Sequence, residues 1–401
     1  MRQYKQDKSN VSSRIINIAT VAVAIGVSAI LIAVSTSQGL QREIQKKTSV
    51  FNGQILVTLF ENNESQVSLQ SFKDDFALRD QILNIPTVER IHSVALKAGM
   101  LKANQEFEGV LFKGVSRNFE WESISEFLTQ GVYPKLVEEA SNEILISETI
   151  LTRLGLSLGD SVNAFFQNES GLRLPKRRKF KVVGVYSSGF PDIDQSLVYL
   201  DIQQIQVLNN WQLDQIGGYE IFVDEFNLVT ETADFIYDKL PSELNSIAIQ
   251  DRYSSIFKWI ALFDFNVAII LIIMILVGVI NMATALLVLI LERSRMVGVL
   301  KALGSNNALI QKIFLYNAVL IISKGLFWGN LIGLGFYFSQ YYFGWIKLDP
   351  LTYFVTQAPV FITLVEVVLL NLFFLSISIV LLWIPSQIIL RISPSQVLRY
   401  R

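Results

Sequence analysis

Four apolar stretches, each long enough to cross a bilayer, constrain this chain more than any other feature of its sequence. A bilayer core of about 30 Å takes about 20 apolar residues in a helix. The stretches cover residues 15–37, 259–291, 313–337 and 360–384. The first is too long for a cleaved signal and lacks an Ala-x-Ala site, so we interpret it as an uncleaved anchor. The expected fold is membrane α-helical with four transmembrane helices, and residues 38–258 form a large extracytoplasmic domain inserted between helices 1 and 2.

The positions of lysine and arginine predict how the spans are oriented. The short segments 1–14, 292–312 and 385–401 together carry eleven basic and two acidic residues. Residues 39–258, in contrast, contain 21 basic and 30 acidic side chains. Because short cytoplasmic segments are enriched in Lys and Arg, we expect the three segments, and with them both termini, to be cytoplasmic. The large domain and the loop 338–359 then lie outside.

The extracytoplasmic domain is predicted to be α+β, in two subdomains. Segments rich in β-branched and aromatic residues predict strands over 53–60, 107–115, 179–188, 196–201 and 218–224. Helical spacing predicts helices over 74–85 and 232–240, and a short one capped by Ser147 and stopped at Gly155.

Several kinds of chemistry are missing from the sequence. The chain has no cysteine, which excludes disulfides and thiolate metal sites. Its single histidine, His92, is interpreted as an ordinary surface or strand residue, and Asp192 and Asp194 as exposed turn residues beside a proline. Phosphate-loop, nucleophile-elbow and zinc-protease motifs are all absent. We therefore predict no enzymatic activity, no catalytic residue, no metal site and no cofactor on this chain, and no nucleic-acid partner.

The segment between the second and third spans combines charged and apolar residues at helical spacing. A helix over about 293–303 places Met296, Leu300 and Leu303 on one face. Its basic side chains can face solvent or an acidic partner. Gly304 suits the left-handed conformation that ends a helix, and Ser305 or Asn306 can cap the next helix. Without further information, the same pattern also fits an ordinary amphipathic loop at the membrane surface.

Small and polar residues inside the spans predict contacts between helices. Glycines that let helix backbones approach closely recur at every fourth position of the third span, as Gly325, Gly329 and Gly333. Charged side chains in a bilayer are rare and usually face protein or water. We expect Lys324 to reach Glu366 or Asn371 on the fourth span, or else to snorkel toward the membrane surface.

A basic run lies between two predicted strands, where residues 166–181 fit a hairpin with a long tip. One interpretation is a solvated basic loop on an acidic domain. The other is an arm that docks a partner outside the membrane, because a positive tip steers association. The residues of this candidate docking hairpin are Leu174, Pro175, Lys176, Arg177, Arg178 and Lys179.

The stretch ERSRMVGVLKALGSNNALIQKIFLYNAVL, residues 292–320, resembles the signature of a permease family that includes the lipoprotein-releasing LolC and LolE proteins, the MacB efflux pumps and FtsX. The segments ILISETILTRLGLSLGDSV and FKVVGVYSSGFPDIDQSLVYLDI look like the family's outer domain. LDPLTYFVTQAPV and the terminal SPSQVLRY are similar to the lipoprotein-releasing branch. Met296 stands where the family usually has an acidic residue.

The resemblance implies a permease subunit of an ABC-type lipoprotein-releasing complex in a Gram-negative inner membrane. Its implied partners are a cytoplasmic ATPase that binds MgATP, a second permease subunit in a homo- or heterodimer, membrane lipid, lipoprotein cargo and a periplasmic carrier, which a hook-like loop near 166–181 would grip. Segment 292–312 would be the coupling helix seated in a groove of the ATPase. The coupling residues it implies are Arg293, Arg295, Met296, Leu300, Lys301, Leu303 and Gly304.

Two other branches of the same family stay open. A MacB-like mechanotransmitting efflux permease usually carries its ATPase fused at the N-terminus, whereas about 14 residues precede the first span here. An FtsX-like regulator of cell-wall hydrolases, which does not transport, generally has a smaller outer domain than residues 39–258.

Overall fold

The computed structural model describes residues 3–62, 67–137, 139–167 and 175–387. The chain forms two compact units. The helical unit takes in the chain up to residue 42, residues 259–347 and the chain from 357 onward, and the sheet unit takes in residues 43–258 and 348–356.

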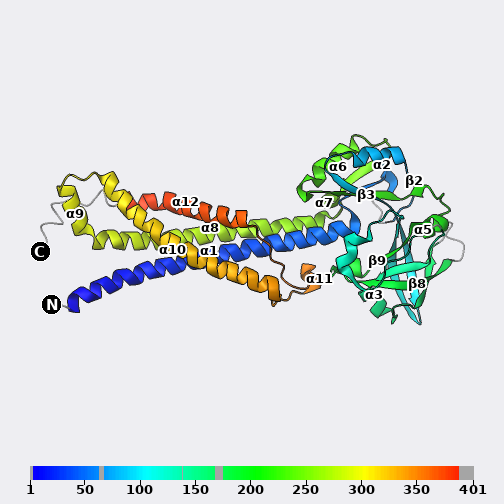
Figure 1. Cartoon of the computed structure of the whole chain (residues 1–401), viewed down its shortest axis with the longest axis horizontal. Coiled ribbons are helices and arrows are strands. Elements are labelled where there is room, and N and C mark those ends of the chain that lie inside the picture. Colours follow the sequence, from blue (N-terminus) through cyan, green and yellow to red (C-terminus); the bar gives the residue numbers. More distant parts are fainter. Residues whose placement is uncertain (1–2, 63–66, 138, 168–174, 388–401) are drawn as a thin grey trace. The chain divides into compact units, whose positions relative to one another are not determined.

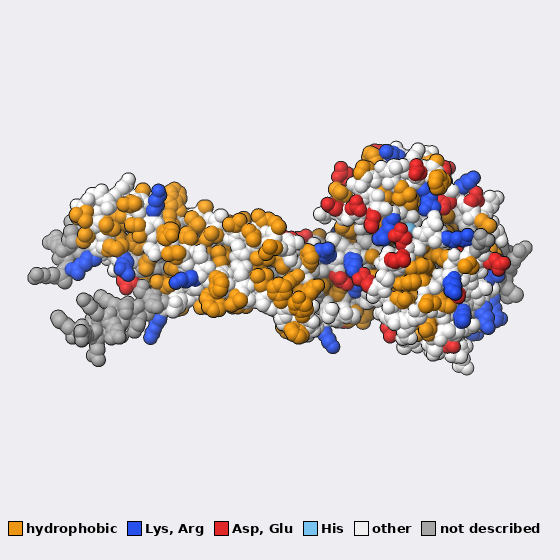
Figure 2. All heavy atoms as spheres, in the orientation of Figure 1, with side chains coloured by type: hydrophobic (Ala, Val, Ile, Leu, Met, Phe, Trp, Pro, Cys, Tyr) orange, Lys and Arg blue, Asp and Glu red, His pale blue; other side chains and the backbone are white. Residues whose placement is uncertain are grey.

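Within the described residues, the structure has four helices that are long and apolar enough to cross a membrane. They are α1 (Gln3–Asn52), α8 (Ser254–Glu292), α10 (Asn307–Phe343) and α12 (Leu364–Ser386). The helices run alongside one another and share a buried apolar core that includes Val23, Ile290, Ile322 and Leu382 (Figure 1). Hydrophobic side chains cover most of the visible middle of this unit (Figure 2).

The sheet unit contains a ten-stranded sheet, in which nine strands follow the order β12-β1-β11-β3-β4-β9-β6-β8-β5 and β7 pairs with β3 and β8. A two-stranded sheet pairs β2 with β10. The strands are β1 (Ile55–Leu59), β2 (Phe72–Lys73), β3 (Val88–Ala103), β4 (Glu106–Val115), β5 (Leu128–Gly131), β6 (Glu143–Ser147), β7 (Ser161–Phe166), β8 (Lys176–Tyr186), β9 (Leu197–Asp201), β10 (Gln215–Ile216), β11 (Gly218–Val223) and β12 (Leu244–Ala248).

Short helices connect or cover these strands. In the sheet unit they are α2 (Phe76–Leu83), α3 (Glu148–Arg153), α4 (Pro191–Asp194), α5 (Ile202–Asn209), α6 (Val229–Tyr237), α7 (Ile249–Arg252) and α11 (Pro350–Tyr353). Short 3-10 helices cover Phe60–Asn62, Trp121–Phe127 and Phe226–Leu228. The helical unit adds α9 (Ser294–Ala302), between α8 and α10.

Two arrangements of strands meet in β3. Strands β12, β1, β11 and β3 are antiparallel neighbours, and with α2 and α6 they follow the chain order of a split βαβ motif. The pairs β3–β4, β4–β9, β9–β6, β6–β8, β8–β7 and β7–β3 close a ring of six strands. Closing a sheet on itself removes exposed edges and favours an interior filled with side chains. The rings of Phe112 and Phe166 meet there, with centroids 4.8 Å apart.

The strand predictions are confirmed where local composition is distinctive, since each of the five predicted segments contains a strand. The other strands, β2, β3, β5, β6, β7, β10 and β12, had not been predicted. Ser147 caps α3 as predicted, because its side chain accepts a hydrogen bond from the Ile150 amide, and Gly155 follows that helix with a φ of 59°. The division of the domain into two subdomains stays a prediction.

His92 corrects one expectation. It lies in β3, as one alternative proposed, but it is 1% exposed and therefore no surface residue. Its ring packs between the rings of Phe119 and Phe222, with centroid distances of 4.7 and 5.2 Å. Neither ring nitrogen has a hydrogen-bond partner among the described residues. Burial, and then the nearby Lys113 charge, lowers the pKa of His92 to about 3.

Candidate functional site

The short helix α9 joins two of the long helices through very little chain. The Arg293 amide donates a hydrogen bond to the Leu289 carbonyl, 3.0 Å away, so the backbone bonding of α8 continues to the start of α9. At the other end, Gly304 has a φ of 87°, and Asn306 caps α10 by accepting from the Ala308 amide. Both features were predicted, and they leave α9 tied closely to α8 and α10.

The apolar residues of α9 are divided between two faces. Val297 is fully buried and Leu300 is half-buried, and both pack against the core of the helical unit. Met296, Val299 and Leu303 are exposed, to 39%, 44% and 78%. Of the three residues predicted to share one face, Met296 and Leu303 are therefore exposed, whereas Leu300 is turned partly into the helical core. Val299 takes the place of Leu300, because positions 296, 299 and 303 follow one side of a helix.

Charged side chains surround the exposed apolar face of α9. Arg293 and Arg295 are exposed, as expected, and Lys301 is half-buried. Glu292, at the end of α8, is also exposed. The exposed surface of this short helix thus combines a small apolar stripe with positive charge, a composition suited to a groove with an apolar floor and acidic walls.

The three glycines of α10 pack against α1. A Cβ atom at Gly325 would lie 2.5 Å from Val23 Cγ1, one at Gly329 would lie 2.7 Å from Val27 Cβ, and one at Gly333 would lie 2.9 Å from Leu31 Cβ. Real side chains do not tolerate such distances. The predicted helix interface is confirmed, and its other side, which the sequence left open, is the first span.

The contact expected for Lys324 is not formed within the described residues. Glu366 lies in the first turn of α12, where it completes a capping box with Thr363 and accepts a 2.8 Å hydrogen bond from Gln38. Asn371 exchanges hydrogen bonds of 2.7 and 2.9 Å with Asn330. Lys324 itself is exposed on α10. The predicted contact was wrong because helix capping and an amide pair satisfy Glu366 and Asn371, whereas the alternative, that Lys324 extends toward the membrane surface, stays a prediction.

The predicted hairpin is present, since β7 and β8 pair, and most of its tip, residues 168–174, lies outside the described residues. Residues 176–179 belong to β8 and pair with β7, so the run lies on a strand. Arg177 and Lys179 are exposed, whereas Lys176 and Arg178 are half-buried, and the Lys176 ammonium donates to the Leu208 carbonyl at 2.6 Å. Pro175 is exposed, and Leu174 lies outside the described residues. Within residues 176–179, only Arg177 and Lys179 are therefore fully available to a partner.

The structure also places polar residues in the sheet unit that sequence reasoning missed. Lys113 and Glu220 form an ion pair of 2.6 Å whose side chains are 1% and 3% exposed. Burial lowers the pKa of Lys113, and the Glu220 carboxylate opposes that shift. Their only sequence signal is a charge inside an otherwise apolar strand segment. Cross-strand pairing brings them together, and this cannot be inferred from local sequence.

Asp194 corrects the expectation of an exposed turn residue. It is 7% exposed, and its carboxylate accepts hydrogen bonds from the Ser188 amide, the Ser188 hydroxyl and the Gly189 amide, at 2.9, 2.7 and 3.0 Å. Burial raises the pKa of Asp194, and these hydrogen bonds oppose that shift. The loop that it organises carries Phe190, whose ring stacks on Phe354 at 4.8 Å within the same unit.

Comparisons with known proteins agree with this architecture. The model of the FtsX-like permease C-terminal domain matches residues 268–394, and that of the MacB-like periplasmic core domain matches residues 18–235. Together with the four apolar helices, these matches define a multi-pass protein of the bacterial inner membrane with a periplasmic α/β domain. The chain belongs to the FtsX/MacB-like family of ABC transporter permeases.

Individual relatives are similar along their whole length. The lipoprotein-releasing system transmembrane protein LolE of Haemophilus influenzae is 20% identical over 411 residues, which cover 99% of this chain and 97% of that protein. LolC of Neisseria meningitidis serogroup B is 23% identical over 421 residues, covering 100% of this chain and 98% of the relative. Among solved structures, the periplasmic region of MacB from Actinobacillus actinomycetemcomitans is 13% identical with a TM-score of 0.34, covering 50% of this chain and 91% of that one.

Proposed function

We propose that this chain is the permease subunit of an ABC-type lipoprotein-releasing complex. Relatives named for lipoprotein release match it from end to end, at 20–23% identity. The observation that carries the proposal is the exposed apolar face of α9, formed by Met296, Val299 and Leu303, on a helix placed between two spans. An apolar face of this kind on a permease without nucleotide motifs suits a separate ATPase.

In the proposed arrangement, α9 and both termini are cytoplasmic, and the sheet unit is inserted between the first two spans on the periplasmic side. A second permease subunit completes the complex, and MgATP binds to the partner ATPase. The complex takes a lipoprotein from the outer leaflet and passes it to a periplasmic carrier. Because withdrawing an acyl chain from lipid costs about 0.8 kcal/mol per CH₂, the transfer needs an energy source, and ATP hydrolysis supplies it.

The two faces of α9 have different parts in this mechanism. Val297 and Leu300 hold the helix against the core of the helical unit, and Met296, Val299 and Leu303 enter a groove on the ATPase. When the ATPase moves, the displacement of the exposed face passes through the buried face into α8 and α10. Because few residues join α9 to α8 and α10, the connecting backbone can absorb little of the movement.

A charge placed on the exposed face tests the role of α9. We expect Leu303→Asp to reduce copurification of the ATPase by about tenfold or more, because a carboxylate without a partner would be buried in the groove. Leu213→Asp is the matched control, since Leu213 is 75% exposed and Leu303 78% exposed, and Leu213 belongs to the sheet unit. The control variant should retain the ATPase.

A normal amount of ATPase bound to the Leu303→Asp variant would contradict the proposed docking face. Leu300→Asp separates docking from folding. Because Leu300 packs against the helical core, its substitution should lower the thermal stability of the permease as well as ATPase binding. The Leu303→Asp variant should lose only ATPase binding.

A further inference from the structure

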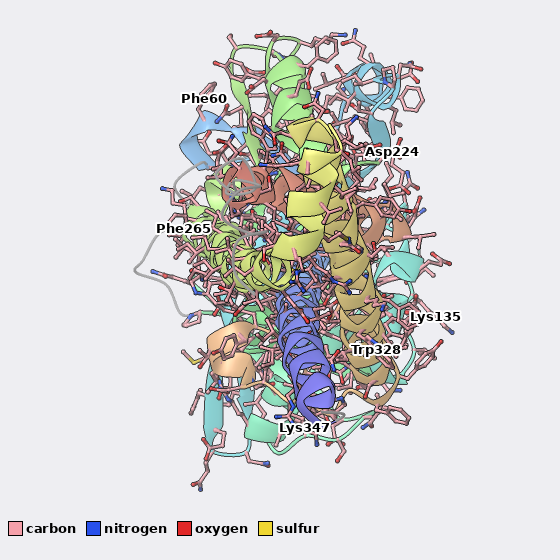
Figure 3. The ribbon with its side chains drawn as sticks, turned by 90° about the vertical axis from the view of Figure 1, so that its left-hand side faces the viewer. Phe60, Lys135, Asp224, Phe265, Trp328 and Lys347 are labelled. Carbon is pink, nitrogen blue, oxygen red and sulfur yellow. The ribbon has the colours of Figure 1, made fainter. Side chains whose placement is uncertain are left out.

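A groove between α1 and α10 lies apart from the surface assigned to the ATPase. Its volume is about 460 Å³, within the range of about 300–1,000 Å³ that is typical of ligand sites. Apolar side chains make up most of its lining, from Val21, Ala24 and Ile25 on α1 and from Trp328 and Ile332 on α10. Figure 3 shows Trp328 on the side where α10 adjoins α1. The volume and the apolar lining of the groove therefore suit a hydrocarbon chain.

One end of the groove is polar. Asn17 and Thr20 complete the lining there, and Asn17 is exposed. The Thr20 hydroxyl donates to the Ile16 carbonyl at 2.9 Å, so its donor is already used within the helix. This end is the one nearer the start of both helices, because Gly325 of α10 packs against Val23 of α1 and, further along both helices, Gly333 packs against Leu31. A ligand that fits the groove thus needs an apolar body and a polar end.

Two cations flank the polar end. Arg14 precedes Asn17 by three residues and Val21 by seven, which places it on the same face of α1. Lys324 precedes Trp328 by four residues, which places it on the same side of α10. Both side chains are exposed, and neither α1 from Arg14 to Arg42 nor α10 contains an acidic residue. The local charge is therefore positive and is not neutralised by these two helices.

The cations are close enough along the bundle axis to act on one group. The Gly325 backbone lies against Thr20, and Arg14 precedes Thr20 by six residues, or about 9 Å along the helix. The stem of Lys324 can extend toward that end, as lysines near an interface commonly do. A lysine within a span is costly unless it is paired. An anion held between Arg14 and Lys324 would remove that cost.

We propose that this groove binds an anionic phospholipid, with one acyl chain against Trp328 and the phosphate between Arg14 and Lys324. Basic pockets between membrane helices recognise such headgroups. A zwitterionic lipid would place its own ammonium beside the two cations and bind less well. In the orientation of the proposed function, the polar end of the groove lies in the cytoplasmic leaflet. The selectivity for an anionic lipid does not rest on that orientation.

The test uses the full-length protein in nanodiscs that contain phosphatidylcholine and phosphatidylglycerol. Native mass spectrometry counts the lipids retained by the released protein. We expect retained phosphatidylglycerol to exceed its share of the nanodisc. Lys324→Gln should reduce this retention about fivefold, as expected for the loss of about 1 kcal/mol per basic residue. Lys312→Gln changes another exposed lysine of α10 outside the groove and should have no such effect.

A second variant tests the apolar part of the site. Val21 is 55% exposed in the groove, so Val21→Trp should fill the groove without disturbing the core and should expel the lipid. Phe327→Trp, on another side of α10 and 64% exposed, is the matched control. Equal retention of the two lipids by the unmodified protein would overturn the proposal. So would an interchain disulfide formed by Val21→Cys with lipid retention unchanged, since the groove would then face a second copy.

Discussion

Gly329 of α10 lies directly against Val27 of α1, so that a Cβ atom on the glycine would come within 2.7 Å of the valine Cβ and 2.9 Å of the Ala24 carbonyl oxygen. This contact explains why glycine recurs along α10. The helix that leads out of α9 is thereby packed against the first span. The interface is a route by which movement at α9 can reach α1.

Adding a methyl group at this contact should destabilise the protein. We expect Gly329→Ala to cost about 1–3 kcal/mol, as overpacking does in other cores, and to lower the midpoint of thermal unfolding in detergent. Gly335→Ala is the matched control, because no atom lies within 4 Å of a Cβ built there on the same helix. Equal unfolding midpoints for the two variants would show that α1 and α10 are not tightly packed.

His92 should make stability depend on pH. Its pKa is about 3 in the folded protein, against an ordinary value of 6.5. Between these values the unfolded chain binds the proton and the folded protein does not, so stability falls as pH falls below 6.5, by up to about 1.4 kcal/mol per pH unit. His92→Phe removes this titration from a site already lined by aromatic rings. Chemical unfolding of both proteins at pH 7.5, 6 and 5 should show a difference that grows toward acid, and parallel pH profiles would exclude this role for His92.

The two aspartates of the GFPDIDQS loop should differ sharply when replaced. Asp194→Ala leaves the Ser188 and Gly189 donors without their acceptor, and each unsatisfied buried group costs about 1–3 kcal/mol. We therefore expect a loss of about 3 kcal/mol in unfolding free energy. Asp192 is exposed, so Asp192→Ala should change stability by less than about 0.5 kcal/mol. Similar stabilities of the two variants, measured by urea unfolding, would refute the structural role of Asp194.

The exposed cations of β8 should affect the rate at which a periplasmic carrier associates, if they form its docking surface. Replacing Arg177 and Lys179 by Ser should slow association several-fold at low salt and weaken its salt dependence, because exposed charges act mainly on association. Lys135→Ser, which removes another exposed lysine of the sheet unit, should leave the rate unchanged. Surface plasmon resonance at low and high salt measures both effects. Identical rates for all three proteins would assign the basic run to the solvated surface.

Local sequence determined the membrane-spanning helices of this protein and several of its helix ends. Long uncharged stretches predict membrane-spanning helices because a segment in a bilayer must be predominantly apolar and must satisfy its own backbone hydrogen bonds. Helix ends are equally local, and for this reason Ser147, Gly304 and the start of α10 at Asn306 could be predicted from a few neighbouring residues. The family signature in residues 292–320 is also local, because the spacing of its apolar and charged residues predicts a short helix between two spans.

Only the tertiary structure decided which groups meet. The helical period places Leu300 and Val299 on neighbouring faces of α9, but the packing of α8 and α10 determines which face is buried. Likewise, the sequence alone allows Lys324 several partners. In the structure, Glu366 bonds instead within the cap of its own helix and with Gln38 on another span. Burial of His92 and Asp194 depends on strands and loops far away in the chain. Such long-range contacts leave little trace in local composition, because the same residue types also suit exposed turns and strand surfaces.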